Sequence, residues 1–122
     1  MDVSDLHDEV FAISPTIRYV AVAHGQEVQM RSRADLLNAS SADSDRYEEL
    51  LVNPAMLTLA TQRGNIDCGG LRYLIIGYGH FHALVIPKAI GHVAVAFDLD
   101  SNPAEHLPAV FDVVARHGLA AI

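Results

Sequence analysis

The sequence predicts an α+β fold in which a single five-stranded antiparallel sheet carries helices on both faces, in the order α-β-β-α-β-β-β-α. The first observation behind this prediction is that three apolar segments between Leu71 and Phe97 are separated only by short breaks containing Gly, His or Lys, as in an antiparallel meander. The second is that only Arg72 and Lys88 are charged between Cys68 and Phe97. Because a sheet with one solvent-exposed face would carry more charged residues, both faces of this meander must be covered.

The chain is expected to begin with a short helix. Ser4 can cap its start, and Pro15 marks its end. Between them, Leu6, Val10 and Ile13 recur on one helical face. This helix should therefore bury one apolar face.

A β-hairpin is predicted next, with strands over residues 18–23 and 26–33 and with His24-Gly25 as a two-residue turn, since Gly accepts a positive φ. If residues 23 and 26 pair, four residues share one face: Tyr19, Ala21, Val28 and Met30. The other face of the second strand is polar, which is typical of a strand at a sheet edge.

Residues 34–44 are rich in small polar side chains and are predicted to form a surface loop. Ser44 or Asp45 then opens the central helix, and the acidic start of this helix over residues 43–49 is interpreted as a solvated turn. Pro54 forbids an undisturbed continuous helix, so we expect a kink or a restart capped by Asn53.

The second helical piece is expected to run to Arg63 and to close at Gly64-Asn65. After the meander, Asn102-Pro103 resembles the start of a last helix that ends before Gly118. This helix carries an apolar stripe of Leu107, Val110, Phe111 and Val114.

The two faces of the meander differ in side-chain size. With Gly79-His80 as a two-residue turn, large side chains share one face: Tyr73, Ile75, Leu84, Ile86, Val93, Val95 and Phe97. The opposite face has smaller side chains, since three of its six residues are alanines: Leu74, Ile76, Ala83, Val85, Ala94 and Ala96. A helix or a second subunit could approach this alanine face closely.

Composition limits the possible functions. The 122 residues, 51% hydrophobic, suit one domain over 1–122, and a single cysteine excludes a disulfide framework. The acidic N-terminus is unlike a secretory signal, and no apolar run reaches the roughly 18 residues of a membrane span. A net charge of −7 opposes binding to nucleic acid or anionic lipid. We therefore expect a cytoplasmic protein without a nucleic-acid or membrane partner.

The element order, together with the segment SPTIRYVAVAHGQEVQMRSR over residues 14–33, resembles the roadblock/dynein light chain family of small profilin-like or longin-like modules. Members of this family typically dimerise through the central helix and the edge strand of the meander, and many regulate or scaffold small Ras-like GTPases. The resemblance implies a single roadblock-like domain that is non-enzymatic, forms a homodimer and binds a protein partner such as a GTPase. It places the interface candidates at Tyr47, Leu50, Leu51, Leu74 and Ile76. Pro54 interrupts the segment that corresponds to the central helix of the family.

Two further hypotheses belong to other classes. The alanine face could line a pocket, as in a small-molecule-binding sensor. Cys68, between Asp67 and Gly69-Gly70, could instead be the nucleophile of an enzyme if a histidine lay nearby, although a lone Cys before a tight turn is more often a small buried residue.

The histidines near the meander turns are the only weak candidates for metal ligands, at His80 and His82. His82 is expected opposite Gly77, where its ring would fill the space above the glycine. His80 and His92 should lie about 20 Å apart at opposite ends of one strand, so they cannot share an ion. We therefore expect no metal and no cofactor.

Overall fold

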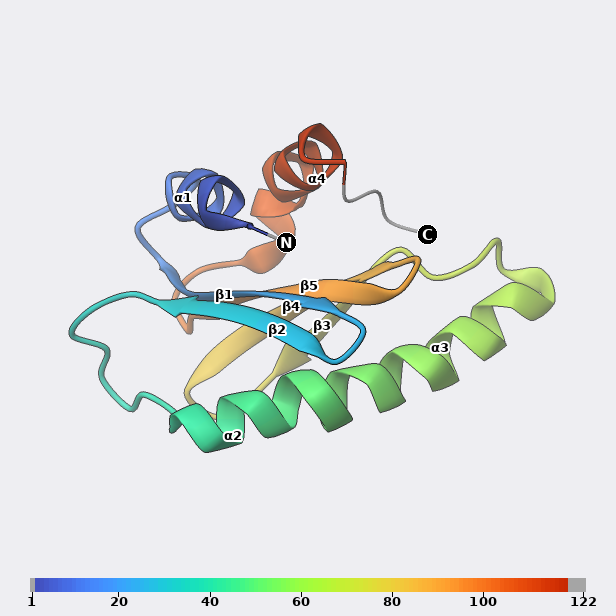
Figure 1. Ribbon diagram of the computed structural model, residues 1–122, viewed down its shortest axis with the longest axis horizontal. Coiled ribbons are helices and arrows are strands. Elements are labelled where there is room, and N and C mark those ends of the chain that lie inside the picture. The colour runs from blue at the N-terminus through green and yellow to red at the C-terminus, as the bar shows by residue number, and fades with distance from the viewer. Residues whose placement is uncertain (1, 119–122) are drawn as a thin grey trace.

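A five-stranded antiparallel sheet forms the middle layer of the protein (Figure 1). The computed structural model describes residues 2–118, so the outermost residues of the expected domain 1–122 lie outside it. Hydrogen bonds join the strands in the order β2-β1-β5-β4-β3. The strands are β1 (Ile17–His24), β2 (Glu27–Ser32), β3 (Leu74–Gly77), β4 (Phe81–Lys88) and β5 (Gly91–Asp98). The predicted α+β fold and element order are confirmed.

Helices cover both faces of the sheet (Figure 1). The first face carries α1 (Ser4–Phe11) and α4 (Leu107–Arg116), with the 3₁₀ turn η2 (Pro103–His106) before α4. The second carries a long helical segment composed of α2 (Ala42–Tyr47), the π-helical turn η1 (Glu48–Val52) and α3 (Asn53–Asp67). No helix within residues 2–118 is long and apolar enough to cross a lipid bilayer.

The main core lies between the sheet and the pair α1–α4. It contains the large-residue face predicted from strand alternation, including Leu84, Ile86, Val93, Val95 and Phe97. On the helical side, this core contains Leu6 and Val10 of α1 and the valines of α4. The apolar side chains recur at helical spacing on α1 and α4 and at a spacing of two on the strands, so each element buries one stripe.

The alanine face points towards α2–α3. Cross-strand pairs Ala21–Ala94 and Ala83–Ala96 place small side chains next to each other on neighbouring strands. These alanines are buried, so the helical segment and its preceding loop cover them. The sequence prediction that something approaches this face is therefore confirmed.

The β1–β2 turn differs from the prediction by one position. His24 pairs with Glu27, so the turn residues are Gly25 and Gln26 rather than His24 and Gly25. Gly25 has a φ of +62° and occupies the first turn position, where a two-residue hairpin turn accepts positive φ. Because the register moved by two residues along β2, the predicted sharing of faces is unchanged.

The central helix begins earlier than expected and passes Pro54 without restarting. Ser41 caps it by accepting a hydrogen bond from the Ser44 amide at 3.1 Å. Asn53 has helical angles and is not a cap, which corrects the predicted restart. A proline clashes with the preceding turn of an α-helix, and a π-helical turn is wider. The turn η1 ends at Val52, two residues before Pro54, and accommodates the proline.

The helix also ends later than expected. It continues through Gly64 to Asp67 and closes with Gly69 and Gly70, whose φ angles are +81° and +94°. Gly64 is needed inside the helix because a Cβ there would lie 2.8 Å from the carbonyl oxygen of Gly70. The glycine pair therefore makes the tight reversal that the sequence predicted before the meander.

Candidate functional site

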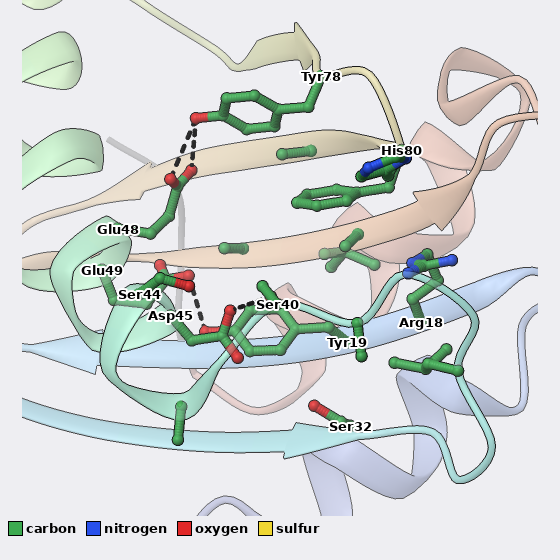
Figure 2. Close-up of a pocket in the computed structure, with 18 of the residues that line it drawn as sticks. Arg18, Tyr19, Ser32, Ser40, Ser44, Asp45, Glu48, Glu49, Tyr78 and His80 are labelled. Atoms are coloured by element: carbon green, nitrogen blue, oxygen red, sulfur yellow. Dashed lines mark hydrogen bonds between the residues drawn. The ribbon is translucent and has the colours of Figure 1, made fainter.

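A cavity of about 790 Å³ lies between the alanine face and the α2–η1 segment (Figure 2). Ala83, Ala94 and Ala96 belong to its lining on the sheet side. The loop from Arg33 to Ser41 borders it through residues that include Leu36 and Ser40. The small side chains of the sheet leave this space because they do not reach the helix above them.

A bulge turns two consecutive side chains into this cavity. The β1–β5 register shifts between Ile17 and Tyr19. Neighbouring side chains of a regular strand point to opposite faces, but Arg18 and Tyr19 both line the cavity (Figure 2). The bulge thus brings a cation and a phenol to one face of β1.

Arg18 fixes the loop beside the cavity. Its guanidinium donates to Oδ1 of Asp98 at 3.2 Å and to the carbonyl oxygen of Leu37 at 2.9 Å. Arg33 donates to both carboxylate oxygens of the same Asp98, and this pairing is the main reason that the pKa of Asp98 is lowered. Both guanidinium groups are therefore engaged by one carboxylate and by backbone oxygens.

A buried polar network lies under η1. The hydroxyl of Tyr19 donates to Oε2 of Glu49 at 2.8 Å, and Nδ2 of Asn53 donates to Oε1 at 2.9 Å. Nε2 of His92 on β5 lies 2.7 Å from the same Oε1. Glu49 is 2% exposed, and His92 and Asn53 are each 1% exposed. The carboxylate thus joins the helix to β1 and β5 through two hydrogen bonds, and the third, from Asn53, lies within the helical segment.

This network raises the pKa of Tyr19, first through burial and second through the charge of Glu49. A neutral phenol can donate to the carboxylate, whereas a phenolate would repel it. Tyr19 therefore stays a donor to Glu49 under ordinary conditions.

Glu48 forms a second contact across the cavity (Figure 2). The hydroxyl of Tyr78 donates to its two carboxylate oxygens at 2.9 and 3.0 Å. Burial raises the pKa of Glu48, while the Tyr78 hydroxyl opposes this effect. Burial also raises the pKa of Tyr78 to about 12, with the hydrogen bond to Glu48 adding to it. The cavity wall therefore holds a partly desolvated carboxylate.

Cys68 is exposed at the end of α3, which corrects the interpretation that it is a buried core residue. Its Sγ lies 3.3 Å from a guanidinium nitrogen of Arg63 and 3.2 Å from Oδ1 of Asp67. Among residues 2–118, these two contacts of the thiol are with an arginine and an aspartate and not with a histidine. The base that the enzyme hypothesis needs is therefore not beside this cysteine.

The two histidine candidates lie at the β3–β4 turn and at the start of β4, and His82 faces Gly77 as predicted. His82 pairs with Gly77, and its Nε2 lies 3.2 Å from the carbonyl oxygen of Leu99. His80 is exposed in the β3–β4 turn and borders the cavity. In the described part of the chain, no group of three or more His, Cys, Asp or Glu side chains could hold a metal ion.

The interface candidates occupy two places. Tyr47 and Leu51 are well exposed on α2 and η1, and Leu50 is half-buried beside them. Leu74 and Ile76 are half-buried on β3, the strand at one edge of the sheet. The fold therefore presents both segments at the surface.

Sequence reasoning missed Glu48, Glu49 and His92 as members of one site. The acidic start of the central helix was interpreted as a solvated turn, but Glu49 is buried and Glu48 is half-buried. One signal was available, because alternation along β5 places His92 on the same face as Ala94 and Ala96. A histidine on a face covered by a helix needs a polar partner, and the helix supplies a carboxylate.

The alternative hypothesis of a small-molecule sensor required an apolar cavity with a few convergent polar groups, and such a cavity is present.

No protein-family model matches this chain, and the search of curated proteins also finds no match. Among solved structures, the fold is similar to that of the gliding protein MglB from Thermus thermophilus. The match has a TM-score of 0.64 and 14% sequence identity, and it covers 92% of this chain and 84% of that chain. The chain therefore has a roadblock/longin-like fold.

Proposed function

We propose that this chain is a cytoplasmic, non-enzymatic module that self-associates and regulates or scaffolds a protein partner. The observation that carries the proposal is an exposed apolar surface on the central helical segment. Of the large apolar side chains that are exposed within residues 2–118, more than half lie on this segment: Tyr47, Leu51, Met56, Leu59 and Ile66. Such a concentration on one element is typical of an interaction surface.

The position of α3 supports this proposal. The helix continues past the ends of the neighbouring strands, so the sheet does not cover its outer part (Figure 1). Leu59 is 69% exposed and Ile66 is 75% exposed. These residues lie seven positions apart, a spacing that places them on one side of the helix. A second copy of the chain could bury both in one contact.

The edge of the sheet offers a second contact region. β3 pairs only with β4, so its outer edge has unpaired backbone groups within the described chain. Ile75, in the middle of this edge strand, is 39% exposed. A short, apolar edge strand can extend its hydrogen bonding to another chain. We therefore place the homodimer interface on α2–α3 and the β3 edge, with Tyr47, Leu50, Leu51, Leu74 and Ile76 within it.

Light scattering coupled to size exclusion, at micromolar concentration, tests self-association. A dimer is expected for the unchanged protein, and Leu59→Asp should shift it towards monomer because the interface would bury a charge. Leu99→Asp is the matched control, since Leu99 is 52% exposed outside this segment and should leave the dimer intact. A strict monomer for the unchanged protein would disprove self-association.

The resemblance to roadblock proteins supplies the partner class, a small Ras-like GTPase. Affinity capture from the native host, carried out once with GDP and once with a non-hydrolysable GTP analogue, tests this part. Mass spectrometry should identify a small GTPase in the captured fraction. If the protein dimerises but captures no GTPase in either nucleotide state, the partner class is wrong and the self-association stands.

A further inference from the structure

We propose that the cavity beneath α2–η1 binds a small organic cation with an apolar body, whose ammonium group pairs with Glu48. This inference goes beyond the role in self-association, because it concerns the space between the helix and the sheet rather than the outer face of the helix. It assigns a ligand class to the alanine-lined face.

The shape and lining of the cavity suit the apolar body of such a ligand. Its volume of about 790 Å³ falls within the range of roughly 300–1,000 Å³ that is usual for small-molecule pockets. Three alanines line it from the sheet, and four aromatic side chains border it: Tyr19, Tyr47, Tyr78 and Phe81. Aromatic rings also attract cations through their negative faces.

The charges around the cavity favour a cation over an anion. The acidic residues that line it are Asp35, Asp45, Glu48 and Glu49, and the basic ones are Arg18 and Arg33, with His80 at the rim. Both arginines already donate to Asp98, and Arg18 also donates to a backbone carbonyl of the loop. An incoming anion would have to compete with these contacts. The carboxylates therefore determine the charge that the cavity accepts.

Glu48, like Asp45 with Ser40, is a half-buried cavity carboxylate whose hydrogen-bond partner is a hydroxyl group. Among the described residues, its hydrogen-bond partner is the hydroxyl of Tyr78, and no lysine, arginine or histidine pairs with it. Glu49 differs, since Tyr19, Asn53 and His92 already occupy its oxygens. A half-buried carboxylate without a cation is unfavourable, and a bound ammonium group would supply the missing charge.

Asn53 gives an independent indication of a donor ligand. This residue is among those that line the same cavity, and it is 1% exposed. Because Nδ2 donates to Glu49, the orientation of the amide is determined, and Oδ1 is buried without a hydrogen-bond partner among residues 2–118. Buried acceptors are almost always satisfied, so an N–H donor is expected here. An ammonium group is such a donor, whereas a carboxylate ligand is not.

Three probes of matched shape test the proposal on the unchanged protein: 2-phenylethylamine, the neutral 2-phenylethanol and the anionic 3-phenylpropanoate. Binding is measured by titration calorimetry and by amide chemical shifts. The amine should bind about tenfold more tightly than the alcohol, and the anion should not bind. The shifts should be largest at Glu48, Tyr78 and the alanines of β5. No binding of the amine at millimolar concentration, or equal binding of all three probes, would overturn the proposal.

Variants separate the charge from the cavity. Glu48→Gln should weaken binding of the amine about tenfold and leave binding of the alcohol unchanged, because the amide keeps the shape but not the charge. Glu105→Gln makes the same change at an exposed site on η2 and should have no effect. Ala96→Leu should exclude both probes by filling the cavity, with circular dichroism confirming the fold. If Glu48→Gln binds the amine as tightly as the unchanged protein, Glu48 does not hold the cation.

Discussion

Glu49 on the π-helical turn and His92 at the start of β5 lie 2.7 Å apart and are both almost fully buried. This contact joins the central helix to the middle of the sheet, although the two residues are far apart in the sequence. Tyr19 and Asn53 also donate to Glu49, so both oxygens of its carboxylate accept a hydrogen bond. This polar contact therefore helps to hold the helix over the alanine face, together with the buried Leu57 of α3.

Removing the carboxylate should destabilise the protein strongly. We expect Glu49→Ala to lower the free energy of unfolding by about 3 kcal/mol, because the Tyr19 hydroxyl and the His92 ring would remain buried without their acceptor. Urea denaturation followed by circular dichroism measures this change. Glu105→Ala, at an exposed site, should cost less than about 0.5 kcal/mol, and equal effects of the two variants would contradict the assigned role of Glu49.

Glu48 should make stability fall as the pH rises. Burial raises its pKa in the folded protein above the ordinary value of 4.5, so the folded state binds this proton more tightly than the unfolded state. The free energy of unfolding should therefore decrease from pH 4.5 upwards through the raised pKa. Glu48→Gln removes this contribution and should be the more stable form at pH 7, by no more than about 1 kcal/mol because solvent screens the half-exposed group.

Urea denaturation between about pH 4 and pH 7 measures the difference between the two proteins at each pH. The difference should grow with pH in favour of Glu48→Gln, while Glu105→Gln should show no such trend. A pH-independent difference would mean that Glu48 has the same pKa in both states.

Gly91 should tolerate no side chain. A Cβ at this position would lie 1.9 Å from the carbonyl oxygen of Ala23, because Gly91 begins β5 and pairs with His24 at the end of β1. We expect Gly91→Ala to lower the free energy of unfolding by more than about 4 kcal/mol or to prevent folding. Gly79→Ala is the matched control, since a Cβ there meets nothing within 4 Å, and thermal unfolding should distinguish the two.

The sheet edge should contribute to assembly more than to folding. Ile75→Lys on β3 should weaken the proposed dimer, because a lysine at the middle of the strand opposes pairing with another chain. Leu74→Asp should act in the same direction but with a larger cost in stability, as Leu74 is half-buried. Sedimentation at several concentrations measures the association, and circular dichroism checks the fold. An unchanged dimer in Ile75→Lys would remove the edge from the interface.

Much of the fold could be predicted because it depends on local patterns. Alternation along β3, β4 and β5 assigned each side chain to the correct face, and the pairing of Gly77 with His82 followed from the turn at Gly79-His80. The boundaries of the central helix were harder to predict. Pro54 was expected to force a kink or a restart; the helical segment does not restart there, and a single π turn precedes the proline.

The candidate site was less predictable than the fold because it depends on long-range contacts. The bulge at Arg18 turns this side chain to the same face as Tyr19, against the alternation of a regular strand. Glu49 looked like one of several solvated acidic residues at a helix start. Only the packing of the helix on the sheet brings it to His92 and buries both.

The amino-acid sequence by itself determined the five strands, the element order and the contrast between a large-residue face and an alanine face, since these follow from residue spacing and turn chemistry. The tertiary structure alone decided that the alanine face borders a cavity, that Glu49 and His92 meet beneath the helix, and that Glu48 has no cationic partner among the described residues. The physical reason is distance along the chain. Side-chain size can be read locally, whereas burial and charge pairing depend on which distant element lies opposite.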